Sequence, residues 1–267
     1  MVVALEYLTA GLYLLASLAA GAGFTLARPA MLRAAVAVLA AGAVAHGAMF
    51  MLLHSAASTP PLTDLPSALS FMAWVGTVAF LLLAWRARLA GLVALVAPMS
   101  CLGVAAAVFS TPAATAPPGV PGTGSLPHAH VLLASTGLAL LGLAGLAGLS
   151  FLVEHRRLKR KRPLAGGAGA GWPSLEALDR TGAFAVAAGF PLLTIGVVTG
   201  SLWERSASGA YFSGNPHETF CLIAWAIYGV LAAVRFGARQ PAVRCALTSI
   251  AGFAFLSIAV LGVEWLA

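Results

Sequence analysis

Long apolar runs separated by mostly short polar connections dominate this chain of 267 residues. A helix of about 20 residues crosses the roughly 30 Å hydrocarbon core of a bilayer, so runs of that length predict membrane spans. Eight runs reach it, at roughly 4–26, 31–53, 66–85, 89–109, 129–153, 180–203, 217–236 and 242–264. No polar segment long enough to form a soluble domain interrupts them. We therefore predict a single polytopic membrane domain over residues 1–267, an all-α bundle of about eight transmembrane helices.

Basic residues fall on alternate connections between these runs. Fourteen of the 15 Lys and Arg residues do so: Arg28, Arg33, Arg86, Arg88, Arg156, Arg157, Lys159, Arg160, Lys161, Arg162, Arg180, Arg235, Arg239 and Arg244. The other connections hold only Arg205. Because cytoplasmic loops are enriched in Lys and Arg, the basic side is predicted to face the cytoplasm. Both termini then lie outside, and the chain is expected to be a multi-pass protein of a bacterial inner (plasma) membrane.

The composition excludes several classes of function. Hydrophobic residues make up 60% and charged residues 9% of the chain, too little charge to cover a soluble domain. A net charge of +7 would suggest nucleic acid in a soluble protein, but here the cations are expected to face anionic lipid of the bilayer. The three cysteines stand singly, so neither a zinc site nor a dithiol centre is indicated.

Ionisable residues are nearly absent from the middles of the spans, which argues against an ion-coupled transporter. No inverted repeat is evident either. No catalytic constellation appears, so we do not expect an enzyme. The histidines remain, and four of them lie at the predicted outer ends of spans: His54, His128, His130 and His217. His46 lies about two turns deeper in the second span.

Two of these histidines are the strongest candidates for a site. His46 lies in an apolar helix and needs a partner, either a hydrogen bond or a metal, and the sequence leaves both interpretations open. His128 and His130 are two residues apart, so they point to opposite sides of a helix. Since His130 immediately precedes the apolar run, it is the better candidate to face the bundle interior.

The sequence also predicts two helix starts. Ser174 is a preferred N-cap ahead of the sixth span. Asn215, Pro216 and Glu218 suit the N-cap, N1 and N3 positions of the seventh, with the carboxylate reaching back to the cap. That pattern explains every residue of the segment except His217. At the same outer level stand the aromatic residues Trp203, Tyr211, Phe212, Phe220 and Trp265. They read first as an aromatic belt, and equally as an apolar shelf of the kind that haem requires.

Residues 189–203, GFPLLTIGVVTGSLW, and 209–225, GAYFSGNPHETFCLIAW, resemble the signature region of the CcsA/CcmC cytochrome c assembly family. In that family the second stretch is a tryptophan-rich loop, WGxYWxWDPKETW, which handles haem on the outer face. Residues 61–85 also resemble its PLxNLYESLxFxxW segment. His130 falls where CcsA-type proteins place their first external haem-ligating histidine. The resemblance covers roughly residues 45–265.

The resemblance implies haem as the cofactor, with His130 as one iron ligand and His46 or His217 as the second. Phe212, Phe220 and Trp225 would then flank the macrocycle.

The chain departs from the signature at several positions. Ser208, Phe212, Gly214 and Phe220 stand in place of its tryptophans, Asn215 in place of its Asp, His217 in place of its Lys and Ala233 in place of a late histidine. This pattern is closest to the HemX/YpjD branch, whose eight-span members have a degenerate loop.

Two functional hypotheses follow. The first is a haem-handling inner-membrane protein that binds or senses haem near the outer face, in support of cytochrome c biogenesis or haem homeostasis. Its expected partners are haem and other biogenesis membrane proteins. The second is a cofactor-free, HemX-like regulatory or scaffold protein that lowers the level of glutamyl-tRNA reductase. It would act on a cytosolic or peripheral partner through the basic inner loop.

Overall fold

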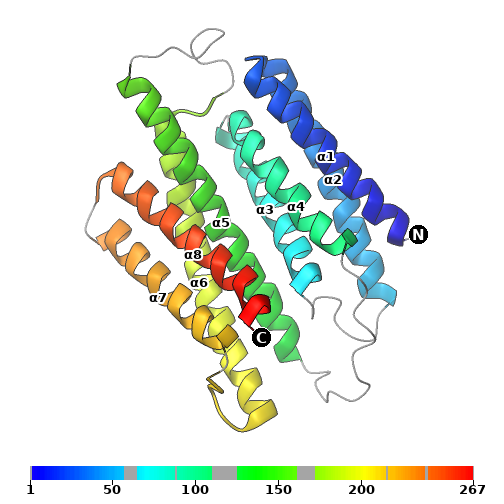
Figure 1. Ribbon diagram of the computed structural model, residues 1–267, viewed down its shortest axis with the longest axis vertical. Helices are drawn as coiled ribbons and strands as arrows, with labels where there is room; N and C mark the ends of the chain where they lie inside the picture. Colours follow the sequence, from blue (N-terminus) through cyan, green and yellow to red (C-terminus); the bar gives the residue numbers. More distant parts are fainter. Residues whose placement is uncertain are drawn as a thin grey trace. The chain divides into compact units, whose positions relative to one another are not determined.

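A computed structural model describes residues 2–56, 65–87, 89–109, 125–160, 172–214, 216–237 and 240–266. All regular structure in these ranges is helical, which confirms the predicted all-α class (Figure 1). The helices are α1 (Val2–Thr25), α2 (Pro29–Ala56), α3 (Leu65–Ala87), the 3-10 helix η1 (Ala90–Leu92), α4 (Val93–Phe109), α5 (Ser125–Lys159), α6 (Leu175–Ser208), α7 (Pro216–Gly237) and α8 (Ala242–Leu266).

Seven stretches, one in each of α1 to α7 (with η1 counted into the fourth), are long and apolar enough to cross a membrane. The chain is therefore a multi-pass membrane protein. For α8, the apolar stretch with described side chains, Ala242–Ile258, is shorter than a full crossing. The eighth span and the outward position of both termini stay predictions.

Helix contacts divide the chain into two compact units. The amino-terminal unit comprises Met1–Thr123 and Arg162–Pro173, and the carboxyl-terminal unit comprises Gly124–Lys161 and Ser174–Ala267. In the amino-terminal unit, α1 packs against α2 and α4, and α3 packs against the same two helices. The four helices thus form a closed ring. The single domain over residues 1–267 stays a prediction.

In the carboxyl-terminal unit, α5 packs against α6 and α8, and α7 also packs against both. Glycines bring these helices close together. A Cβ atom at Gly137 would lie 2.6 Å from Leu193 N on α6, and one at Gly148 would lie 2.9 Å from Ala246 O on α8. In a membrane, where lipid provides no hydrophobic drive between helices, such small residues favour close packing.

The ends of α6 and the start of α7 follow the local sequence signals. Ser174 Oγ accepts a hydrogen bond from Ala177 N at 3.2 Å, which confirms the predicted N-cap. Gly209 ends α6 with φ of 83°, a conformation that glycine adopts without strain. α7 begins at Pro216, as its N1 position predicts. The predicted cap, Asn215, lies outside the described residues.

Candidate functional site

His130 lies near the start of α5 and bonds to the backbone of α6. Its Nδ1 atom is 2.8 Å from the carbonyl oxygen of Gly196. Because a carbonyl only accepts, Nδ1 carries the hydrogen, and in the neutral form of the ring Nε2 then presents its lone pair. Metal-ligating histidines usually donate their other N–H in this way, which fixes the ring orientation and raises the basicity of the ligating nitrogen.

Small residues on α6 make room for this ring. A Cβ atom at Gly200 would lie 2.8 Å from His130 Cε1 and Nδ1, closer than real Cβ contacts allow. One helical turn further, the Trp203 ring lies with its centroid 6.1 Å from that of His130. Positions 196, 200 and 203 share one helix face, so α6 offers His130 an acceptor, a gap and an aromatic wall.

Trp225, a second predicted site residue, contacts a different face of α6. Its Nε1 donates to Thr194 Oγ1 at 3.0 Å, and its ring stacks on Phe190 with centroids 6.2 Å apart. Thr194 and Gly196 are two positions apart in the chain, which corresponds to about 200° around a helix. The structure therefore does not bring Trp225 and His130 to the same side of α6.

The loop between α6 and α7 is held at both ends by charged side chains. Arg205 donates a hydrogen bond to the Tyr211 hydroxyl and lies 4.3 Å from the centroid of that ring. Glu218 Oε2 accepts hydrogen bonds from Ser213 N at 2.8 Å and Gly214 N at 3.2 Å. Glu218 thus reaches back from the first turn of α7 to the two amides that precede the predicted cap, and its predicted bond to Asn215 itself lies outside the described residues.

The remaining aromatic candidates lie in or beside this loop. Phe212 is 48% exposed, so one side of its ring is open to a ligand or to lipid. Phe220, in the second turn of α7, is half-buried. The side chains of His54, His128 and His217 lie outside the described residues.

His46 belongs to the amino-terminal unit and is fully buried there. Nδ1 lies 3.3 Å from the Tyr13 hydroxyl, and Nε2 lies 2.9 Å from Ser70 Oγ. The ring also stacks on Phe50 with centroids 4.9 Å apart. The sequence left open whether His46 has a hydrogen-bond partner or a metal as its partner. These contacts give both ring nitrogens a hydrogen-bond partner. A ligand role for His46, which stays a prediction, would require the loss of one of these bonds.

Several partners of the two histidines were missed by sequence reasoning. For His130, the signal was the small-xxx-small spacing of Gly196 and Gly200, which permits close helix contact. For His46, the signal was the presence of Tyr13 and Ser70 in otherwise apolar spans. Neither spacing nor polarity reveals which helices become neighbours.

Metal ligands do not cluster in the described part of the chain, where no group of three or more His, Cys, Asp or Glu side chains converges. Cys101, Cys221 and Cys245 lie on three different helices, α4, α7 and α8. A metal ion bound by protein ligands alone is therefore not indicated by these residues. His130 alone can supply only one bond to a metal ion. The bound molecule, such as a metal-containing cofactor, would have to supply most of the other bonds to the metal.

Comparison with known proteins places most of the chain in one group. The family model described as "Cytochrome C assembly protein" matches residues 62–267. The chain is similar to the cytochrome c biogenesis protein CcsA of Guillardia theta, with 29% identity over 224 residues that cover 77% of this chain and 74% of that relative. It is also similar to CcsA of Prochlorococcus marinus (strain NATL2A), with 28% identity over 233 residues and the same coverage of each chain. The family match includes His130 and the loop before α7, whereas His46 precedes it.

Proposed function

This chain belongs to the cytochrome c assembly protein family, and from that premise we propose that it binds or senses haem near the outer face of a bacterial inner membrane. It would do so in support of cytochrome c biogenesis or haem homeostasis. Haem and other membrane proteins of cytochrome c biogenesis are the proposed partners. The proposed role is binding or sensing of haem, without catalysis by this chain.

The observation that carries this proposal is the contact of 2.8 Å between His130 Nδ1 and the carbonyl oxygen of Gly196. In the neutral imidazole, donation from Nδ1 leaves Nε2 as an oriented nitrogen ligand. Haem iron takes such an imidazole as an axial ligand, and the bound haem would supply the iron centre. Gly200 and Trp203 hold the imidazole in place from α6. The residues around His130 therefore fit one axial ligand.

The other members of the proposed site follow from the family resemblance. His217, in the first turn of α7, or His46 would provide the second ligand. Phe212 and Phe220 would flank the macrocycle, and Trp225 would do so only where the macrocycle reaches the other face of α6, which Trp225 contacts. Of these rings, Phe212 in the loop has the most open surface, with Trp225 36% exposed.

Haem titration of the purified full chain tests the proposal. Wild-type protein should take up haem with a Soret band typical of histidine ligation, and His130→Ala should weaken haem retention and shift that band. His128→Ala is the matched control, because position 128 lies about 200° around a helix from position 130. Comparison of His46→Ala with His217→Ala identifies the second ligand. If the wild-type protein takes up no haem even in excess, the proposal is wrong.

Two observations favour the second, cofactor-free function. Two residues in place of signature tryptophans, Ser208 and Gly214, offer no aromatic surface, and both ring nitrogens of His46 are already hydrogen-bonded. A HemX-like regulator would then affect the level of glutamyl-tRNA reductase through the basic inner connection. In that case His130→Ala should leave the reductase level unchanged in cells. Replacement of Arg156 and Arg157 by Gln should alter it.

A further inference from the structure

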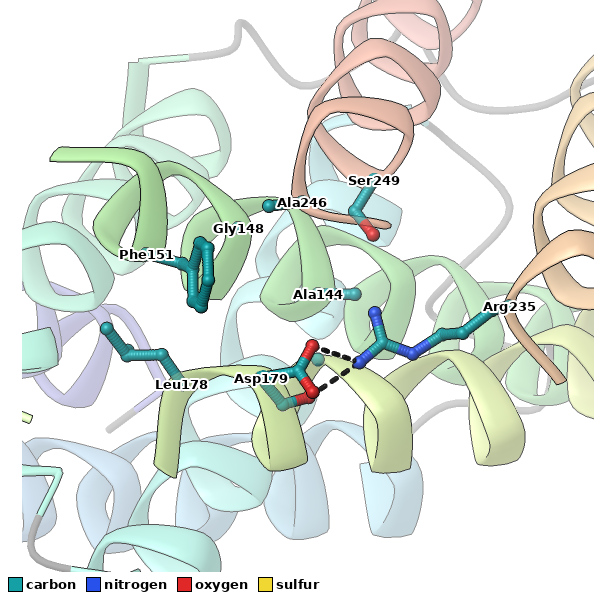
Figure 2. Close-up of a pocket in the computed structure, with 9 residues that line it drawn as sticks. Ala144, Gly148, Phe151, Leu178, Asp179, Arg235, Ala246 and Ser249 are labelled. Carbon is teal, nitrogen blue, oxygen red and sulfur yellow. Dashed lines mark hydrogen bonds and ion pairs between the residues drawn. The ribbon is translucent and has the colours of Figure 1, made fainter. Parts of the chain in front are cut away.

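An ion pair between a buried arginine and a partly exposed aspartate joins α6 and α7 at the end of the carboxyl-terminal unit that carries its basic connections. Arg235 Nη2 donates to both Asp179 Oδ1 and the Asp179 carbonyl oxygen, each at 2.7 Å. The Arg235 side chain is only 7% exposed, although it belongs to the last turn of α7. Figure 2 shows it extending across to Asp179 beside a hollow. The hollow lies between α5, α6, α7 and α8 and is lined by Ala144, Gly148, Phe151, Leu178, Asp179, Gly182, Arg235, Ala246 and Ser249.

The guanidinium has more donors than this pair uses. Both of its hydrogen bonds come from Nη2, and Nη1 and Nε bond to no described residue. Nη1 faces Gly182, where an added Cβ atom would lie 4.0 Å away and would meet no nearer atom. Neither nitrogen is among the described buried atoms that lack a partner, so both are accessible at the hollow, where water or a ligand oxygen can accept from them. The hollow therefore presents unused N–H donors to whatever enters it.

Acceptors face the same space. Asp179 Oδ2 accepts no hydrogen bond from any described residue, and the Asp179 side chain is 39% exposed. Ser249 Oγ donates its own hydrogen to Cys245 O at 2.9 Å, so its oxygen can still accept. In Figure 2 the Ser249 hydroxyl points toward the same hollow. The site thus combines unused cationic donors with unused acceptors, and the pair at its centre has no net charge.

Size and depth restrict the group that can bind. With its open side, the hollow contains about 190 Å³ of empty space, but its interior admits roughly one oxygen-sized group. Asp179 lies in the second turn of α6, and Arg235 lies two residues before the end of α7. Both positions are close to the helix ends, where lipid headgroups meet a membrane protein. A ligand of this site would insert one oxygen beside Nη1 and keep the rest of its headgroup at the opening.

We propose that this hollow binds the headgroup of phosphatidylethanolamine. A phosphate oxygen would accept from Arg235 Nη1, and the primary ammonium, held at the opening, would donate to Asp179 Oδ2, whose side chain is partly exposed. Phosphatidylglycerol has the phosphate but no ammonium, and phosphatidylcholine has a trimethylammonium without N–H donors. Because a neutral Arg–Asp pair attracts an anion weakly, the complementary ligand carries both charges, as phosphatidylethanolamine does.

Native mass spectrometry of the delipidated full chain tests this proposal. Each lipid is added back in turn, and the bound fraction is measured. Wild-type protein should retain phosphatidylethanolamine at least several-fold better than phosphatidylcholine or phosphatidylglycerol. Gly182→Val, which fills the hollow without a change of charge, should abolish the preference, and so should Arg235→Gln. Arg244→Gln is the matched control, because Arg244 is exposed and bonds through its side chain only to Gln240 among the described residues.

Four results would overturn the proposal. Equal retention of the three lipids would mean that the hollow binds no lipid headgroup and holds water. Preferred retention of phosphatidylglycerol would mean that the cationic residues of the protein attract any anionic lipid. Survival of the preference in a folded Gly182→Val protein would place the lipid elsewhere. O-phosphoethanolamine without acyl chains should compete only weakly. If it binds as tightly as the lipid, the ligand is a soluble phosphate ester.

Discussion

The imidazole of His130 rests against Gly200, so closely that a Cβ atom at Gly200 would lie 2.8 Å from the ring atoms Nδ1 and Cε1. The same ring bonds to Gly196 one turn earlier on α6. The orientation of the proposed ligand therefore depends on the absence of a side chain on a neighbouring helix. A substitution at Gly200 can therefore change the orientation of the His130 ring without removing the ring, so the effect of orientation on haem binding can be measured by itself.

We expect Gly200→Ala to weaken haem retention while His130 remains in place. The new methyl group must displace the imidazole or the helix, and the bond from Nδ1 to Gly196 O is lost. Loss of such a supporting hydrogen bond typically lowers metal affinity by about 10-fold or more. Haem titration followed at the Soret band measures the effect. Gly21→Ala, where a Cβ atom meets nothing within 4 Å, is the control. Wild-type affinity in Gly200→Ala would contradict the seating of His130 described above.

Loss of the hydroxyl group should change the free energy of unfolding differently at two buried tyrosines, Tyr13 and Tyr228. Tyr13→Phe removes the partner of His46 Nδ1 and should lower the free energy of unfolding by about 1–3 kcal/mol, the cost of leaving a buried polar group unpaired. Tyr228 is equally buried, but its hydroxyl has no hydrogen-bond partner among the described residues. Tyr228→Phe should therefore be neutral or stabilising. Unfolding in mild detergent compares the two, and a large loss of stability in Tyr228→Phe would show that its hydroxyl has a partner.

The carboxylate of Glu218 should control the opening of the loop before α7. Glu218→Gln replaces two charge-assisted acceptor contacts with weaker ones, so the amides of Ser213 and Gly214 should exchange with solvent faster. Hydrogen exchange read by mass spectrometry over this segment measures the change. Glu176→Gln, which removes an exposed pair with Arg180 at the other end of α6, should leave this loop unaffected. Unchanged exchange in Glu218→Gln would mean that other contacts hold the loop.

Reporter fusions should establish the orientation that the basic residues predict. A fusion after residue 165 should be active only as a cytoplasmic reporter, because the connection there carries the densest Lys and Arg cluster. Fusions at Gly119 and after Ala267 should report the outside. An opposite result at two of these three sites would make the predicted topology wrong and would move the proposed haem site to the cytoplasmic side.

The sequence by itself determined the helices, because apolar length and end signals are local properties. Runs of about 20 apolar residues predict the spans, and Ser174 and Pro216 mark the starts of α6 and α7 through their own cap and N1 preferences. The family is also readable from the sequence, since residues 189–225 keep the spacing of the signature despite its lost tryptophans. The candidate status of His130 follows from the same resemblance.

Only the tertiary structure decided which side chains meet. The bonds of His46 to Tyr13 and Ser70 join three helices, and the bond of His130 to Gly196 joins residues 66 positions apart in the chain. Arg235 looked from the sequence like one more topological cation, yet its guanidinium is buried against Asp179. In an apolar bundle most faces of a helix have similar hydrophobicity, so periodicity does not select its neighbours. Close packing at glycines and the need to satisfy each buried polar group make that selection, and both depend on atoms of another helix.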